Sequence, residues 1–345
     1  MNGIVNGRKP LIQVKNLKKY FEIKGKGELH AVDNISFDIY PGETLGLVGE
    51  SGCGKSTVGN VIMRLHKPTG GELIYGEKDV FKTAGKQELL EMCSKIQIIF
   101  QDPYSSLNPR KTIRSILKEA YKIHRIGSDK EKDEKIDTLC NDCGISRDLL
   151  NKYPHELDGG KRQIVGIARA LSLSPEFIVC DEPVSSLDVS IQATIINLLM
   201  DLQKKRGLSY LFISHDLSVV RHISNRIAVM YLGQIIESAE TDDIFNNAVH
   251  PYTIALLSAI PKVEIGKKVS RIVLKGDVPS PLNPPEGCRF APRCWMAQDI
   301  CKKETPVLRD TGEMGHCVAC HFWEESRAAA EKEQAAMKKT EMLPT

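Results

Sequence analysis

Residues 49–57 read Gly49-Glu50-Ser51-Gly52-Cys53-Gly54-Lys55-Ser56-Thr57, and this stretch decides the fold of the chain. It fits the phosphate-binding pattern G-x-x-x-x-G-K-[ST]. Glycines in such a loop leave room for backbone N–H groups to turn toward a polyphosphate. The ammonium of Lys55 can then neutralise the β- and γ-phosphates, and the hydroxyl of Ser56 can bind Mg²⁺. We therefore predict that Gly49 and residues 51–57 bind the phosphates of a nucleotide.

The sequence on either side of this loop favours the same interpretation. Residues 44–48, Thr44-Leu45-Gly46-Leu47-Val48, predict a short buried strand that runs into the loop. Residues 57–65 predict the helix that follows, and its N-terminus adds the positive end of a dipole to the phosphate site. A chance glycine-rich turn needs neither a strand before it nor a helix after it, so we reject that alternative.

Two further apolar strands end in residues that suit nucleotide hydrolysis. Asp181 and Glu182 follow one predicted strand, and His215 follows the next. At the end of a buried strand, Asp181 can bind Mg²⁺ while Glu182 polarises the attacking water. We expect His215 to lie within reach of the γ-phosphate. A helix predicted over 191–205 separates the two strands, and this alternation predicts an α/β fold with a mostly parallel sheet.

Length and composition limit the remaining classes of protein. The chain has 345 residues, enough for two domains, and its formal charge of +3 gives no reason to expect nucleic acid as a partner. No apolar run approaches the roughly 20 residues that a membrane span needs. Residues 1–10 lack the apolar core of a signal peptide, so we expect a cytosolic protein in which disulfides are rare.

A second glycine-containing segment precedes the helix predicted over 164–173. It reads Leu157-Asp158-Gly159-Gly160-Lys161-Arg162-Gln163. Two glycines at the start of a helix leave N–H groups free to bind an anion. The alternative is an ordinary helix cap, for which Asp158 is well suited. The residues alone leave both roles open.

These motifs, in this order, resemble the ATP-binding subunits of ABC transporters over residues 11–261. The resemblance implies that Tyr20 stacks on the adenine of ATP, and that Gln101 senses Mg²⁺ and contacts membrane subunits. It also implies that Ser186-Leu187-Asp188 crosses a dimer interface. In such dimers each ATP lies between the phosphate loop of one subunit and the Asp158-Gly159-Gly160 segment of the other.

A closer resemblance is to the oligopeptide and dipeptide importers of that family. It rests on residues 100–109, 153–157 and 250–253 and on the cysteine-bearing tail. It implies a peripheral protein on the cytoplasmic face of a bacterial cell membrane. Its partners would be a second, non-identical ATP-binding subunit, two transmembrane permease subunits and an extracellular substrate-binding protein. Importers of nickel or other small solutes, and a soluble ABC-type ATPase, are the alternatives.

The chain departs from the family at positions 158 and 161, where Ser and Gln are usual and Asp158 and Lys161 stand here. An ionised Asp cannot donate the hydrogen bond that Ser gives to γ-phosphate. Two unit charges about 4 Å apart at an effective dielectric near 20 repel by roughly 4 kcal/mol. We therefore expect an asymmetric pair, in which the Asp158 site turns ATP over slowly unless Lys161 or Arg162 screens the charge or Asp158 caps its helix.

Five of the ten cysteines crowd into residues 288–320. Cys288, Cys294, Cys301 and Cys320 match four thiols of many ATPases in this branch. Four thiolates fit a [4Fe–4S] cluster or a Cys₄ zinc site, and the long irregular spacings favour iron–sulfur. A zinc ion or no metal at all are the alternatives, and Cys317 could replace Cys320 or take no part.

The domain organisation follows from these observations. We predict an ABC nucleotide-binding domain over 1–260 with a RecA-like core, an antiparallel β subdomain and a helical subdomain at about 102–170. A small irregular, cysteine-rich extension over 261–323 follows. The Ala/Glu/Lys-rich residues 324–345 predict a solvated helical or disordered tail.

Overall fold

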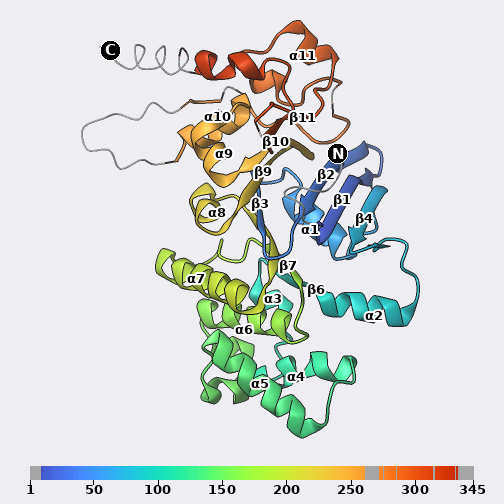
Figure 1. Ribbon diagram of the computed structural model, residues 1–345, viewed down its shortest axis with the longest axis vertical. Helices are drawn as coiled ribbons and strands as arrows, with labels where there is room; N and C mark the ends of the chain where they lie inside the picture. Colours follow the sequence, from blue (N-terminus) through green and yellow to red (C-terminus); the bar gives the residue numbers. More distant parts are fainter. Residues whose placement is uncertain are drawn as a thin grey trace, which may run out of the picture.

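The computed structural model describes residues 9–260, 272–274, 276–284, 286–313, 315–330 and 332. Helices 113–123 and 129–143 lie at one end of the molecule, and the segment after residue 286 lies at the other (Figure 1). Strands β1 to β10 lie between them. Most of the tail expected over 324–345 falls outside the described residues, but residues 323–330 are helical.

The main sheet has eight strands in the order β11-β12-β10-β9-β3-β8-β7-β6. Five adjacent strands run parallel: β6 (Ile96–Ile99), β7 (Phe177–Asp181), β8 (Ser209–Ser214), β3 (Thr44–Val48) and β9 (Arg226–Tyr231). The remaining three pair antiparallel: β10 (Gln234–Glu240), β12 (Cys317–Val318) and β11 (Arg309–Asp310). The mostly parallel sheet predicted from the sequence is confirmed.

The parallel strands end at the same edge of this sheet. Val48 lies opposite Ser214, and Asp181 lies opposite Ile213. Along β8, Tyr210 and Phe212 face one apolar core and Leu211 and Ile213 face another. The sheet is therefore covered on both faces, as parallel sheets require, and loops that follow the strands meet at one edge.

A second, antiparallel sheet covers one of these faces. Its order is β2-β1-β4-β5, with β1 (Ile12–Ile23), β2 (Gly27–Ile39), β4 (Gly70–Tyr75) and β5 (Lys78–Asp79). Helix α1 (Lys55–Ile62) lies between the two sheets and buries Val58 and Val61 in their shared core. The helix begins at Lys55, two residues before the expected Thr57, and Gly54 just before it adopts a left-handed conformation (φ 106°) that glycine permits.

The helical subdomain is built from short amphipathic helices. α4 buries residues spaced three or four apart, as an apolar helix face requires. Ser128 and Glu131 form a capping box at the start of α5, and Gly144 ends that helix at φ 67°. The elements are α3 (Pro103–Ser106), α4 (Ile113–Ile123), α5 (Asp129–Cys143), η1 (Arg147–Asn151), η2 (Pro154–Glu156) and α6 (Gly159–Leu171).

The C-terminal extension packs onto the core rather than standing apart from it. Strand β12 pairs with β10, with Val318 opposite Glu237 and Cys317 opposite Ser238. The other helices are α2 (Lys86–Lys95), α7 (Val189–Arg206), α8 (Leu217–Ile223), α9 (Thr241–Asn247), α10 (Pro251–Ser258), η3 (Ala291–Arg293) and α11 (Asp299–Lys303). None of the described helices combines the length and apolarity that crossing a bilayer requires.

Candidate active site

The glycine-rich loop lies between β3 and α1, at the carboxyl edge of the main sheet. A Cβ atom on Gly49 would lie 2.1 Å from the carbonyl oxygen of Met230, and one on Gly54 would lie 2.0 Å from that of Ala31. Real Cβ atoms cannot come so close, so only glycine fits at these two positions. The loop can therefore fold tightly and present backbone N–H groups rather than side chains, as a phosphate cradle must.

Lys55 lies inside this loop with 4% of its surface exposed. Its ammonium donates hydrogen bonds to the carbonyl oxygens of Gly49, at 2.8 Å, and Glu50, at 2.9 Å. These two acceptors hold the positive charge where the loop encloses it. A bound polyphosphate offers the same ammonium stronger, charged acceptors.

Two oxygen-bearing side chains lie together beside the loop. The hydroxyl of Ser56, in the first turn of α1, donates to a carboxylate oxygen of Asp181, at the end of β7, at 2.8 Å. Asp181 is 6% exposed, and burial, with Glu182 nearby, raises the pKa of its carboxyl despite the hydrogen bond from Ser56. Oxygen donors of these two kinds fit Mg²⁺, which prefers carboxylate, hydroxyl and water ligands.

Glu182 connects three strand ends. Its carboxylate accepts a hydrogen bond from the amide of Gln101, after β6, at 3.0 Å. It also lies 3.2 Å from Nδ1 of His215, after β8. The side chain of Glu182 is only 13% exposed, and its backbone is left-handed (φ 45°), a strained conformation typical of functional sites. The structure thus brings together the predicted residues Gln101, Glu182 and His215.

Tyr20 lies on the antiparallel sheet and is stacked on His30, with ring centroids 3.9 Å apart. Its hydroxyl donates to Asp33, so burial and this carboxylate raise the pKa of the phenol. The N–H of Asp33 donates to the carbonyl of Gly233, whose own N–H donates to the carbonyl of Cys53. These bonds connect the tyrosine to the phosphate loop. Sequence reasoning missed His30 and Asp33, which sit among ordinary strand residues.

The segment Asp158-Gly159-Gly160 forms a different surface. Asp158 caps α6 by accepting from the N–H of Lys161 at 2.8 Å, and the Lys161 ammonium lies 2.7 Å from its other oxygen. This cap explains why α6 begins at Gly159 and not near Ile164. Lys161 holds the pKa of Asp158 below its usual range. Within the described part of the chain, no hydrogen bond or ion pair joins this segment, or the exposed Asp188, to the phosphate loop.

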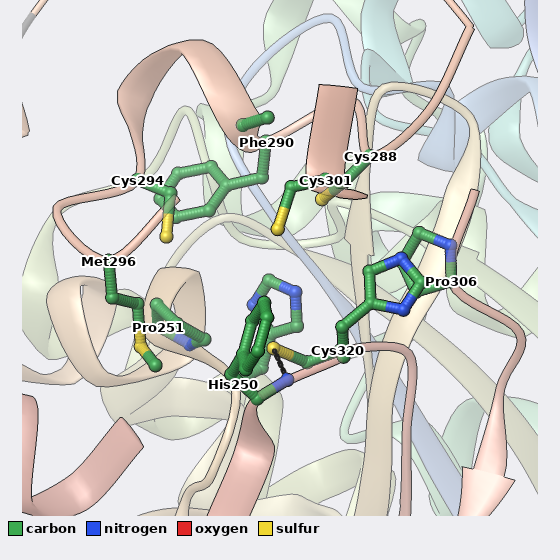
Figure 2. Close-up of a pocket in the computed structure, with 12 residues that line it drawn as sticks. His250, Pro251, Cys288, Phe290, Cys294, Met296, Cys301, Pro306 and Cys320 are labelled. Carbon is green, nitrogen blue, oxygen red and sulfur yellow. Dashed lines mark hydrogen bonds between the residues drawn. The ribbon is translucent and has the colours of Figure 1, made fainter. Parts of the chain in front are cut away.

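The four predicted thiols line one small cavity of about 20 Å³ in the extension. Figure 2 shows the sulfurs of Cys288, Cys294, Cys301 and Cys320 directed toward this space. Burial raises the pKa of Cys294 to about 12 and that of Cys320 to about 11. Among the described residues, however, no group of three or more Cys, His, Asp or Glu side chains is placed to hold a metal ion. Cys317 lies on β12 and does not line the cavity.

Comparison with known proteins agrees with this geometry. Residues 32–185 match the family described as ABC transporter, and residues 236–301 match the C-terminal region of oligopeptide/dipeptide transporters. The oligopeptide transport ATP-binding protein AppF of Bacillus subtilis is 48% identical over 321 residues, which cover 91% of this chain and 97% of that protein. The chain belongs to the ABC transporter family of ATP-binding proteins.

Other similar proteins include a second transport protein and a solved ATP-binding cassette. The dipeptide transport ATP-binding protein DppF of Haemophilus influenzae is 47% identical over 326 residues, which cover 93% of this ABC protein and 99% of DppF. Among solved structures, the dimeric ATP-binding cassette MJ0796 bound to ADP and phosphate is 28% identical, with a TM-score of 0.61, covering 67% of this chain and 98% of that one. The α/β fold and the transport-coupled ATPase predicted from the sequence are confirmed.

Proposed function

We propose that this ABC protein hydrolyses ATP to energise an importer of oligopeptides or dipeptides. The observation that carries the proposal is the cluster of Lys55, Ser56, Asp181, Glu182 and His215 at one edge of the sheet. Similarity to oligopeptide and dipeptide transport proteins supports the substrate class. The protein would lie on the cytoplasmic face of the membrane with two permease subunits, and an extracellular binding protein would supply the substrate.

The residues divide the chemistry of hydrolysis among them. Gly49 and residues 51–57, which include Lys55, would bind the phosphates, and Tyr20 would stack on adenine. Ser56, Asp181 and Gln101 would hold Mg²⁺, which supplies Lewis-acid stabilisation of charge on the phosphates. Glu182 would accept a proton from the attacking water, while the bond between the β- and γ-phosphates breaks to give ADP and phosphate. Gln101 and His215 fix the orientation of that carboxylate.

We also propose that the working unit is a dimer with a non-identical ATP-binding subunit. The cassette MJ0796 is dimeric, and residues 185, 186 and 188 are exposed here beside Val189, which is 82% exposed. Lys161 lowers the pKa of the Asp158 carboxyl, which favours its ionised form, and the charge of that carboxylate is paired with the Lys161 ammonium. The ion pair offsets part of the repulsion toward ATP, but an ionised carboxylate still donates no hydrogen bond. The site completed by Asp158 would therefore bind ATP and hydrolyse it slowly.

We further propose that Cys288, Cys294, Cys301 and Cys320 bind a [4Fe–4S] cluster. The four thiols line a single cavity, which fits one thiolate for each iron. The long irregular spacings of these cysteines favour a cluster over a zinc site, which usually has short paired spacings. Iron and sulfide analysis after anaerobic purification tests this proposal directly. Zinc without iron, or no metal, would refute it.

The catalytic assignment is tested by ATP hydrolysis in the purified importer complex. We expect Lys55→Ala or Glu182→Gln to lower turnover by at least about 100-fold. Glu176→Gln is the matched control, because Glu176 pairs with Lys95 at the opposite end of β7. If turnover survives both substitutions, the assignment is wrong. Full activity of this subunit as a lone homodimer would refute the asymmetric dimer.

A further inference from the structure

The extension reaches the phosphate loop through Arg293, which ends the 3₁₀ turn η3. Its guanidinium forms a two-point ion pair with Glu50, the second residue of the loop, with N–O distances of 2.7 and 3.1 Å. The arginine side chain is 8% exposed and the glutamate side chain 27%. Glu50 raises the pKa of the guanidinium further, so Arg293 stays charged. A partly buried, bidentate pair of this kind fixes the orientation of both partners.

Aromatic side chains hold the same two residues in place. The N–H of Glu50 donates to the hydroxyl of Tyr252 at 2.9 Å, and Arg293 lies 3.4 Å from the hydroxyl of Tyr231. Phe290, three residues before Arg293, packs edge-on against both tyrosine rings. The backbone and the carboxylate of Glu50 are therefore both set by groups outside the loop.

The charge of Glu50 needs this partner. Glu50 belongs to a loop that is built to enclose a triphosphate, and an unpaired carboxylate there would repel each phosphate. The cation that pairs with it is not Lys55, whose ammonium is held by the carbonyl oxygens of Gly49 and Glu50. It is Arg293, 243 residues away along the chain. The pair Glu50–Arg293 presents no net charge to the nucleotide.

We propose that Arg293 is a positioning residue for nucleotide binding, acting through Glu50 to cancel a negative charge in the phosphate loop. The C-terminal extension would thus complete the electrostatics of the ATP site without touching ATP. The inference rests on the proposed binding of phosphates by residues 49–57. This electrostatic role differs from a purely structural one in its ligand dependence. The loss of affinity caused by removing Arg293 must grow with the number of phosphates on the nucleotide.

The test is a titration of the full-length protein with ATP, ADP and AMP in the presence of Mg²⁺. We expect Arg293→Gln to weaken ATP binding by roughly tenfold, because it leaves one uncompensated negative charge in the phosphate loop. The loss should shrink from ATP to ADP to AMP. Glu50→Gln should tighten ATP binding, because it leaves Arg293 as a free cation. The double variant should bind ATP within about threefold of the unchanged protein.

The controls separate the possible failures. Arg309→Gln alters another arginine of the extension, whose guanidinium donates to the backbone carbonyls of Cys320 and His321, and should lower nucleotide affinity much less than Arg293→Gln does. If Lys55→Ala also leaves ATP binding intact, the proposed phosphate site itself is wrong. Where Lys55→Ala abolishes ATP binding, two results refute only the role of Arg293. One is an Arg293→Gln variant that binds ATP as tightly as the unchanged protein. The other is a double variant whose affinity for ATP is as low as that of Arg293→Gln. Should Arg293→Gln fail to fold, an unchanged or weaker ATP affinity of Glu50→Gln refutes it equally.

Discussion

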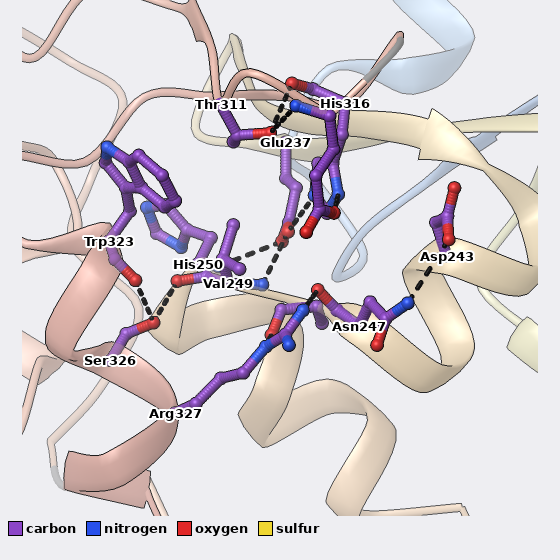
Figure 3. A network of polar contacts seen from close by, with 12 residues as sticks. Glu237, Asp243, Asn247, Val249, His250, Thr311, His316, Trp323, Ser326 and Arg327 are labelled. Atoms are coloured by element: carbon purple, nitrogen blue, oxygen red, sulfur yellow. Dashed lines mark hydrogen bonds and ion pairs between the residues drawn. The ribbon is translucent and has the colours of Figure 1, made fainter.

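Replacing His316 by glutamine should loosen the C-terminal extension from the main sheet, and more strongly in acid than in base. Figure 3 shows the contacts that are at stake. Nε2 of His316 lies 2.9 Å from a carboxylate oxygen of Glu237, on β10, and both side chains are at most 1% exposed. The same carboxylate accepts hydrogen bonds from the backbone N–H groups of Val249 and His250. His316 thus joins the extension to a buried charge in the core.

The sign and size of the effect follow from these contacts. Burial alone would lower the pKa of His316, but Glu237, with Glu313 and Asp243 nearby, outweighs burial and raises it. Because the pKa of His316 is higher in the folded state, its protonation stabilises the fold. This contribution is complete below the unfolded-state pKa of about 6.5 and is lost as the pH rises through the folded-state pKa. A hydrogen bond to a charged group contributes about 1.5–3 kcal/mol and a neutral one about 1 kcal/mol. We therefore expect His316→Gln to cost about 2 kcal/mol near pH 6 and less than about 1 kcal/mol near pH 9.

Tryptophan fluorescence during urea unfolding measures the loss of stability within the extension itself. The chain has two tryptophans, Trp295 and Trp323, and both lie in the extension. The nearby His250 does not interfere, because burial lowers its pKa to about 4 and it stays neutral throughout. His222→Gln, on the exposed face of α8, is the matched control. A destabilisation that is equal at both pH values, or larger in base, would refute the argument.

Three further outcomes follow from the geometry. Gly54→Ala should abolish nucleotide binding measured by titration, because its Cβ would lie 2.0 Å from the carbonyl oxygen of Ala31; normal binding would mean that the loop is less constrained than the contacts imply. Asp158→Ala should destabilise α6 by about 1 kcal/mol in thermal unfolding, whereas Asp158→Asn, which can still cap, should cost less; equal losses would contradict the capping role. In mass-spectrometric alkylation of the native protein, the exposed Cys93 should react before Cys143, whose pKa burial raises to about 12, and the reverse order would contradict the burial.

The sequence predicts the centre of the active site well because its signals are local. A glycine spacing, an apolar run before it and a helix after it all fall within about twenty residues of Lys55. Asp181 and His215 were then placed by one topological rule, that parallel strands end at the same edge of a sheet. The register confirms it, with Val48 opposite Ser214 and Asp181 opposite Ile213. Each of these steps needs only a short window of sequence.

The contacts of the extension could not be predicted in this way. Strands β11 and β12 have two residues each, too few to show an alternating pattern. Arg293 forms an ion pair with Glu50, and Arg289 forms one with Asp33, each across about 250 residues of chain. No local sequence pattern specifies such pairs. One signal was present: two arginines lie within an apolar, cysteine-rich segment. Charged side chains in a segment that becomes buried need charged partners elsewhere.

These contacts have a thermodynamic consequence, because coupling between two sites acts equally in both directions. Arg293 joins the extension to the phosphate loop, while Arg289 donates to Asp33 and to the carbonyl of Leu232, beside the tyrosine expected to stack on adenine. If seating of the extension strengthens ATP binding by a given factor, bound ATP must favour seating by the same factor. Whatever holds the segment 288–294 in place then adds to nucleotide affinity without contacting the nucleotide. The extension would then act as part of the ATPase, and the first effect of its loss should be weaker binding of ATP.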